Sequence, residues 1–190
     1  MTSPAEAVEE RRPPAYTVRP ARPVDADGLP EIERRAARRF AEIGLAFLAD
    51  GEPTPVDVFR RACRRGHLWV AAGNGGEVVG FAVVRALDDD LHLQEMDVVP
   101  EHGRRGLGRR LVESVCAGAR ERGARRVTLT TFRDVPWNAP FYRRLGFREI
   151  APELFSPALR RMVAKELDAG LVPELRCVME RVVDPGSTQA

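Results

Sequence analysis

The chain has 190 residues, and 44% of them are hydrophobic, which is enough for one domain with a substantial core. Its 30 lysines and arginines nearly balance 28 aspartates and glutamates, giving a formal net charge of +2, whereas nucleic-acid-binding domains are usually strongly basic. No apolar stretch of about eighteen residues is present to span a membrane, and the N-terminus lacks the apolar core of a signal peptide. We therefore expect a cytoplasmic protein that binds neither nucleic acid nor membranes.

Hydrophobic periodicity predicts strands alternating with helices between two flexible tails, residues 1–15 and 184–190. Asp25 is placed to cap the first helix, and the glycine-rich turn 73–76 joins two strands. In chain order we expect strand 16–19, a helix after Asp25 with an apolar face that reaches Ile43, helix 56–65, strands 68–72, 78–86 and 91–99, helix 108–119, strand 126–131, helix 139–145, strand 147–150, helix 157–167 and strand 176–182. This order predicts a single α/β domain over residues 16–183, with a mixed central sheet flanked by helices.

The loop between strand 91–99 and the helix that follows reads HGRRGLG and is the most informative segment. Free backbone amides and the positive end of the helix dipole meet at such a position, and both attract anions, usually phosphate. Glycines let the backbone approach the ligand, and arginines add positive charge; these residues are Gly103, Gly106 and Gly108 with Arg104, Arg105, Arg109 and Arg110. The sequence therefore predicts a site for a phosphate-bearing cofactor.

Two common phosphate-binding motifs do not fit this loop. A P-loop requires a lysine directly after its second glycine, but Lys165 is the one lysine of the chain and lies far from the loop. The dinucleotide fingerprint GxGxxG is followed by an acidic residue about twenty positions later. Here the glycines read GxxGxG, and residues 128–131 are Thr-Leu-Thr-Thr.

The hexapeptide Gly103-Arg104-Arg105-Gly106-Leu107-Gly108 instead resembles the pyrophosphate loop [QR]xxGxG[AG] of the GNAT superfamily of N-acetyltransferases, with Gly103 in place of the usual glutamine or arginine. A second segment, NAPFYRRLGF at 138–147, is similar to the FYxxLGF segment of the same family. The resemblance covers roughly residues 16–183. It implies a GNAT-like fold with about six to seven strands, and acetyl-coenzyme A as the co-substrate. It also implies transfer of the acetyl group to a primary amine, of a small molecule in preference to a peptide.

The resemblance also implies roles for individual residues. Main-chain groups at the end of strand 91–99 would bind the pantetheine arm and the thioester carbonyl; these belong to Met96, Asp97, Val98 and Val99. The loop residues Gly103, Arg104, Arg105, Gly106, Leu107, Gly108 and Arg109 would bind the pyrophosphate. Tyr142 would donate a proton to the leaving thiolate, although a helix tyrosine can also serve packing alone. Asn138 either contacts the cofactor or caps its helix.

The general base is less clearly marked. Members of the family often use a glutamate on or near this strand, which makes Glu95 the first candidate, against the alternative of a partnered or solvent-facing acid. His92 has a more suitable ordinary pKa but comes earlier on the strand. No cluster of residues with metal-ligand spacing is visible, so no metal is expected.

The acceptor pocket is expected between the helices of residues 25–66 and the loop 132–137. There Trp137 could form an apolar wall or equally pack against the sheet, and Arg133 could attract an acidic group. The arginines Arg34, Arg35, Arg38 and Arg39 are expected on a solvent-exposed helix face. The alternative function is a sensory or regulatory module that binds acyl-coenzyme A without turnover. Similar proteins are commonly homodimers joined through C-terminal strands.

Overall fold

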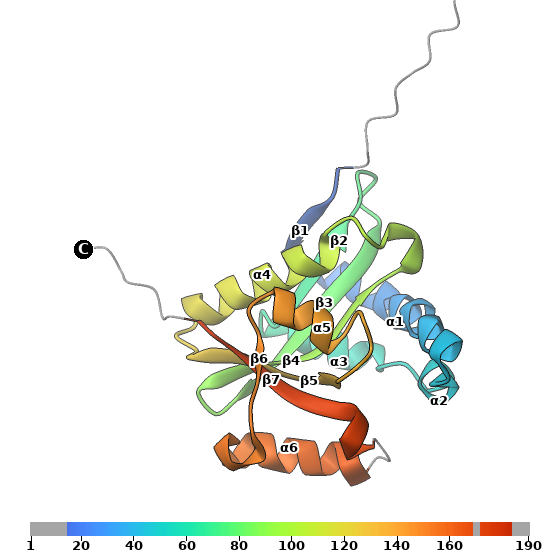
Figure 1. Cartoon of the computed structure of the whole chain (residues 1–190). Helices are drawn as coiled ribbons and strands as arrows, with labels where there is room; N and C mark the ends of the chain where they lie inside the picture. The colour runs from blue at the N-terminus through green and yellow to red at the C-terminus, as the bar shows by residue number, and fades with distance from the viewer. Residues whose placement is uncertain (1–14, 169–171, 184–190) are drawn as a thin grey trace, which may run out of the picture.

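A computed structural model describes residues 15–168 and 172–183 of the chain. The predicted tails therefore lie outside the described residues, apart from Ala15. Within the described part, seven strands form one sheet in the order β1-β2-β3-β4-β5-β7-β6 (Figure 1). Their bounds are β1 Thr17–Pro20, β2 Leu68–Ala72, β3 Val78–Leu87, β4 Asp90–Val98, β5 Arg126–Phe132, β6 Arg148–Glu149 and β7 Arg176–Val182. Only β4 and β5 are parallel among these neighbours, which confirms the predicted mixed sheet.

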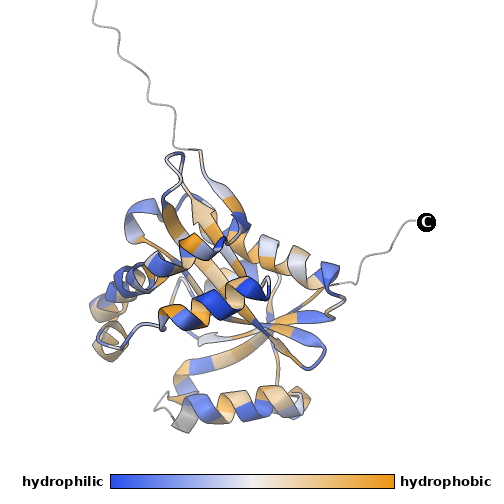
Figure 2. Ribbon diagram, turned by 180° about the vertical axis from the view of Figure 1, so that it is seen from behind, coloured by the Kyte–Doolittle hydropathy of each residue, from blue (hydrophilic) through white to orange (hydrophobic). Residues whose placement is uncertain are grey.

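Helices cover both faces of the sheet. Their bounds are α1 Leu29–Ala37, α2 Ala46–Ala49, α3 Val56–Arg64, α4 Leu107–Glu121, α5 Ala139–Arg144 and α6 Pro157–Asp168. Figure 1 shows α4 and α5 in front of the sheet and α1 to α3 behind it. In Figure 2 the strands are mostly hydrophobic, whereas the covering helices alternate hydrophobic and hydrophilic residues, as amphipathic helices do. None of the helices described is both long and apolar enough to cross a membrane.

The first helical region differs from its prediction. Asp25 lies in a 3₁₀ helix, Pro23–Gly28, that precedes α1, so it does not cap α1. Its carboxylate instead accepts hydrogen bonds from the backbone N–H of Arg22 at 2.6 Å and from the Arg19 guanidinium at 2.6 and 3.0 Å. A charge-assisted pair of this kind is stronger than a neutral cap, and its partner on β1 has no signature in the local sequence.

The predicted apolar helix face is also shorter than expected. Helix α1 ends at Ala37, and a second 3₁₀ helix, Arg38–Ile43, follows it. This tighter winding removes Phe40 and Ile43 from the buried α1 face, which consists of Leu29, Ile32 and Ala36. Helix α2 was not predicted.

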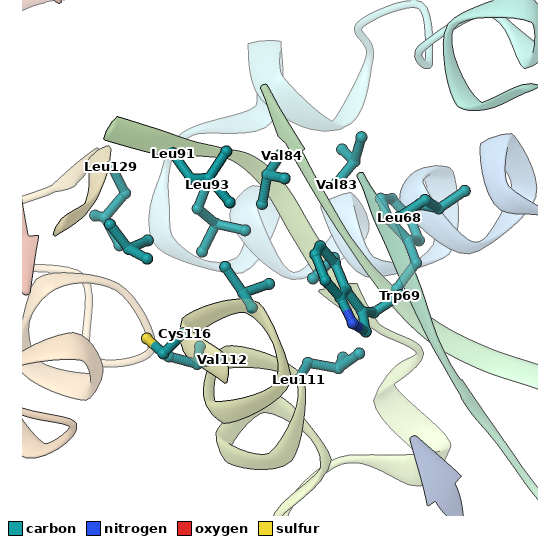
Figure 3. Close-up of a cluster of buried hydrophobic side chains, with 14 of the residues drawn as sticks. Leu68, Trp69, Val83, Val84, Leu91, Leu93, Leu111, Val112, Cys116 and Leu129 are labelled. Carbon is teal, nitrogen blue, oxygen red and sulfur yellow. The ribbon is translucent and has the colours of Figure 1, made fainter. Parts of the chain in front are cut away.

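Helix α4 packs closely onto the sheet. Figure 3 shows Leu111, Val112 and Cys116 of α4 facing the side chains of the strands, with Trp69 of β2 beside them. At Gly118 a Cβ atom would lie only 2.5 Å from Cζ2 of Trp69. The absence of a side chain at this position therefore allows the helix to lie against the indole.

The sheet opens between β4 and β5. Their backbones pair over three residues only, Leu91–Leu93 with Val127–Leu129. Directly after this pairing β4 carries a bulge, because Val84 of β3 faces Leu93 whereas Val83 faces Glu95, leaving Gln94 without a partner. A bulge bends its strand and redirects side chains, and here it coincides with the point where β4 leaves β5.

The contact between α4 and Trp69 predicts that Gly118→Ala destabilises the protein. Alanine favours a helix by about 1 kcal/mol, but overpacking costs about 1–3 kcal/mol, so we expect a net loss in the free energy of unfolding. Urea unfolding measures it. Ala117→Gly, at an exposed position of the same helix, is the control for helix propensity alone. An increase in stability for Gly118→Ala would contradict the close packing.

Candidate active site

A cavity of about 1160 Å³ lies where β4 and β5 diverge. It is lined by residues of α1, the 3₁₀ helix after it, β4, the loop before α4, β5 and α5. Its size exceeds the usual range for small-molecule sites of about 300–1,000 Å³. The cavity brings Tyr142 and Glu95 together with the glycine-rich loop, as the sequence predicts.

The loop presents unbonded backbone amides at one end of the cavity. Gly106 adopts φ +76° and is the N-cap residue of α4. The first backbone bond into the helix is donated by the N–H of Arg110 to the carbonyl of Gly106 at 3.1 Å. Between residues 104 and 109 no backbone N–H has an acceptor in the described part of the chain. These amides and the dipole of a 15-residue helix suit an anion such as phosphate.

Of the arginine side chains of the loop, some face the cavity and one faces Tyr16. Arg104 and Arg109 line the cavity together with the loop glycines and Leu107, but Arg105 does not. The Arg105 guanidinium carbon lies 5.9 Å from the centre of the Tyr16 ring. The Tyr16 hydroxyl is in turn hydrogen-bonded to Nδ1 of His102 at 2.9 Å, and this bond ties the start of the loop to the residue before β1.

The end of β4 offers main-chain groups to the cavity, although not from both predicted valines. The N–H of Val99 donates to the carbonyl of Val79 at 2.9 Å, so it has no hydrogen left for a ligand. In an antiparallel pair, hydrogen-bonded residues alternate with residues that are not bonded across the pair. Val98, which faces Gly80, therefore turns its N–H and C=O away from β3, toward the opening. The structure assigns main-chain exposure to Val98 and packing to Val99.

Tyr142 is held on α5 with its ring packed between Phe141 and Phe147, at centroid distances of 5.2 and 5.6 Å. The residue is 8% exposed and lines the cavity. Its hydroxyl makes no hydrogen bond to another of the described residues. Burial, together with the nearby carboxyls of Glu95 and Asp97, raises the pKa of Tyr142. The phenol is therefore protonated at neutral pH and can act as a proton donor.

Glu95 faces the same cavity from β4. Its carboxyl is exposed to the cavity, but protein atoms crowd it on the other sides. This desolvation and the negative charge of Glu33 raise the pKa of Glu95 to about 7, against an opposite effect of Arg176. Burial and the charges of Glu95 and Glu33 also raise the pKa of Asp97. A carboxyl with a pKa near neutrality suits a general base.

His92 is not brought to the cavity. Its ring is buried, and Nδ1 lies 2.9 Å from the Thr128 hydroxyl. Burial and the positive charges of Arg85 and Arg176 lower the pKa of His92 to about 3. The imidazole is therefore neutral and enclosed, which fits a structural role.

Asn138 lines the cavity, and its Nδ2 donates to the Thr131 hydroxyl at 2.7 Å. The side chain makes no cap hydrogen bond to α5, although the backbone carbonyl accepts from the N–H groups of Phe141 and Tyr142. Its Oδ1 is enclosed and lacks a partner within the described residues. A buried acceptor of this kind is costly unless a ligand satisfies it.

Several cavity residues were not identified from the sequence. Glu33 of α1 follows the buried Ile32 and was hidden at the edge of an amphipathic face. Glu166 and Arg176 reach the cavity from α6 and β7, and only the tertiary fold brings them there. Arg39, expected on a solvent-exposed face, stacks 3.9 Å from the Trp137 ring centre at the cavity wall.

Two other expectations concern this region. Trp137 and Phe40 lie edge to face at 5.8 Å and both line the cavity, which corresponds to the first of the two alternatives for Trp137. Arg133 is not among the lining residues, because its guanidinium pairs with Glu149 at 2.5 Å. Within the described ranges, no group of three or more His, Cys, Asp and Glu side chains is arranged to hold a metal ion.

Comparison with known proteins places this site in a family. A model of the acetyltransferase (GNAT) family matches residues 33–147, which include β4, the loop and α5. Streptothricin acetyltransferase from Streptomyces lavendulae is 38% identical over 84 residues, 42% of this chain and 43% of that protein. The match thus spans less than half the length of this curated relative.

Solved structures show the same fold. A GNAT-family acetyltransferase from Staphylococcus aureus Mu50 has a TM-score of 0.66 at 16% identity, covering 90% of this chain and 100% of that one. PaiA N-acetyltransferase from Thermoplasma acidophilum, solved in complex with coenzyme A, has a TM-score of 0.63 at 14% identity, covering 88% and 99%. At these identities the likeness concerns the fold alone. Because the family model covers more than half of the sequence, the chain belongs to the acetyltransferase (GNAT) family.

Proposed function

We propose that this protein transfers the acetyl group of acetyl-coenzyme A to a primary amine of a small molecule. The observation that carries the proposal is one cavity with an anion-binding loop at one end and Tyr142 with Glu95 beside it. Family membership and the coenzyme A bound to a structural neighbour support the choice of cofactor. We take residues 16–183 as the catalytic domain.

The residues present fit coenzyme A. The unbonded amides of residues 104–109 and the positive end of α4 would hold the pyrophosphate, aided by Arg104 and Arg109. The main-chain groups of Val98 would bond the pantetheine arm, and the free Oδ1 of Asn138 would accept a hydrogen bond from it. Acetyl-coenzyme A supplies an activated acetyl group and a thiol leaving group.

Two side chains would move protons. Glu95, as a carboxylate, takes a proton from the acceptor ammonium, directly or through a water, so that the neutral amine can attack. As the C–N bond forms and the C–S bond breaks, the Tyr142 hydroxyl gives its proton to the departing sulfur. The raised pKa of Tyr142 keeps that proton available at neutral pH.

The direct test is isothermal titration with acetyl-coenzyme A, followed by thiol release on an amine panel that includes streptothricin, the acceptor named for the relative. Saturable binding and amine-dependent thiol release are expected. Binding without release on any amine would favour the non-catalytic acyl-coenzyme A module. No binding would contradict the assignment of the loop.

Gly106→Glu is expected to weaken acetyl-coenzyme A binding by at least about 100-fold, since it places a negative charge and a strained side chain in the anion site. Titration calorimetry measures the affinity. Gly76→Glu is the matched control: Gly76 also has a positive φ, +84°, with open space around it, but it lies in the β2–β3 turn. Equal effects of the two variants would refute a specific role of the loop.

The raised pKa of Glu95 predicts the pH dependence of the reaction. Below about pH 7 the carboxyl is protonated and cannot accept a proton, so kcat/KM should rise with pH and level off above it. In Glu95→Gln the part of this rise that comes from Glu95 should disappear, and kcat should fall by about 100-fold or more. The acceptor amine titrates identically in both proteins, so pH–rate profiles with one amine separate the two effects. A limb that persists in the variant would exclude Glu95 as the base.

Tyr142→Phe removes the hydroxyl and keeps the ring that packs on Phe141 and Phe147. We expect kcat to fall by about 100-fold, with little change in acetyl-coenzyme A affinity. Stopped-flow thiol release and calorimetry provide the two readings. Full activity in this variant would show that the sulfur obtains its proton elsewhere.

A further inference from the structure

The wall of the cavity near Tyr142 carries three carboxyl groups that are not in ion-pair contact with a cation among the described residues. Glu33 from α1 and Glu95 and Asp97 from β4 all line it. None of the three has an ion-pair partner within 4.0 Å in the part of the chain that the structure describes. They are close enough that each of Glu33 and Glu95 acts on the pKa of Asp97.

The remaining acid of this wall is already compensated. The Glu166 carboxylate accepts a hydrogen bond from the Thr130 hydroxyl at 2.6 Å and pairs with the Arg176 guanidinium at 3.1 Å. The same guanidinium stacks on Phe132, with its central carbon 5.0 Å from the ring centre. The Arg176 Nε has no hydrogen-bond partner among the described residues, and the charge of Arg176 lowers the pKa of Glu95, but Arg176 is not in ion-pair contact with Glu33, Glu95 or Asp97.

Arg39 does not fill this role either. Its guanidinium lies over the Trp137 ring, and although its charge acts on Asp97, the two groups are not in ion-pair contact. The arginines of the glycine-rich loop are not among the charges that act on Glu95 or Asp97. The cavity is therefore basic at its loop end and acidic at the end near Tyr142.

The geometry of Glu33 is fixed in advance. Both of its carboxylate oxygens accept from the backbone N–H of Thr54, at 3.1 and 3.0 Å, and one also accepts from the Thr54 hydroxyl at 3.2 Å. These neutral donors orient the carboxylate without cancelling its charge. Burial raises the pKa of Glu33, against the opposite effects of the Thr54 hydrogen bonds and of the charge of Arg34, which forms its ion pair with Glu31 instead.

A second observation marks this wall as a ligand site. Tyr142 is 8% exposed and lines the same cavity, and its hydroxyl makes no hydrogen bond among the residues described. The enclosed Nε1 of Trp137, which also lines this cavity, has no partner among them either. One carboxylate, Glu95, is needed for the proton of the reacting amine. A single ammonium beside Glu95 would leave Glu33 and Asp97 without an ion-pair partner. A second cation beside them would stabilise the charged forms of these two carboxyls, which burial disfavours.

We propose that the acceptor carries two cationic groups: the reacting amine faces Glu95, and a second ammonium is held by Glu33 and Asp97. This inference rests on the proposed acetyl transfer and adds the class of acceptor, a diamine or polyamine. Glu33 is then a specificity-determining residue that contacts the acceptor away from the bond that forms.

The test compares linear diamines with monoamines of the same chain length, using acetyl-coenzyme A as donor. For the best diamine, kcat/KM should exceed that of its monoamine by at least about tenfold, mainly through KM. Glu33→Gln keeps an acceptor for Thr54 but removes the charge. It should bring kcat/KM for the diamine down to that for the monoamine when both are compared well above pH 7, where Glu95 is a carboxylate in either protein, and the acetyl-coenzyme A affinity should stay constant. Calorimetric binding of the same diamine should weaken in parallel.

Glu31→Gln is the matched control, because Glu31 lies on the same helix, pairs with Arg34 at the surface and is outside the cavity. It should retain the preference for diamines. Equal rates on diamines and monoamines would overturn the inference and leave the proposed function standing. Equal losses on both amines in Glu33→Gln would also overturn it. Failure to bind acetyl-coenzyme A would overturn the proposed function, and the inference with it.

Discussion

The end of backbone pairing between β4 and β5 is the constraint on which the rest of the site depends. The strands share three paired residues and then separate where Gln94 bulges from β4. Backbone groups beyond that point have lost their neighbouring strand, and buried polar groups need partners. The cavity, the exposed main chain of Val98 and the position of Glu95 opposite α5 all follow from this opening.

Helix α4 links the core to the site. One of its faces fills the space above the sheet, with Gly118 against Trp69, while its first turn presents the unbonded amides of the loop. The start of the loop is tied to Tyr16 through His102. The packing that stabilises the fold therefore also fixes the amides in place, so that little ordering of the backbone remains to be done when an anion binds.

The sequence was sufficient for the parts of the structure that depend on local pattern. Apolar spacing located most helices and strands. The two motifs that the sequence singled out, the glycine-rich loop and the segment with Tyr142, line one cavity. Prediction failed where distant partners decide the outcome. Asp25 pairs with Arg19 instead of capping α1. The Val99 N–H donates to the Val79 carbonyl of β3 instead of facing the cavity. Glu33, Glu166 and Arg176 come together only through the fold, because they belong to three separate elements.

One part of the cavity wall comes from a segment beyond the family match. The match to the family ends at residue 147, after the loop and α5, whereas Glu166 and Arg176 come from the segment beyond it. Because the loop would bind an anion through backbone amides, Gly103 can stand in place of the usual glutamine or arginine without removing those amides. Glu166 and Arg176 of α6 and β7 can therefore be changed without touching the loop, Glu95 or Tyr142 in the sequence, and such changes would alter one part of the cavity wall alone.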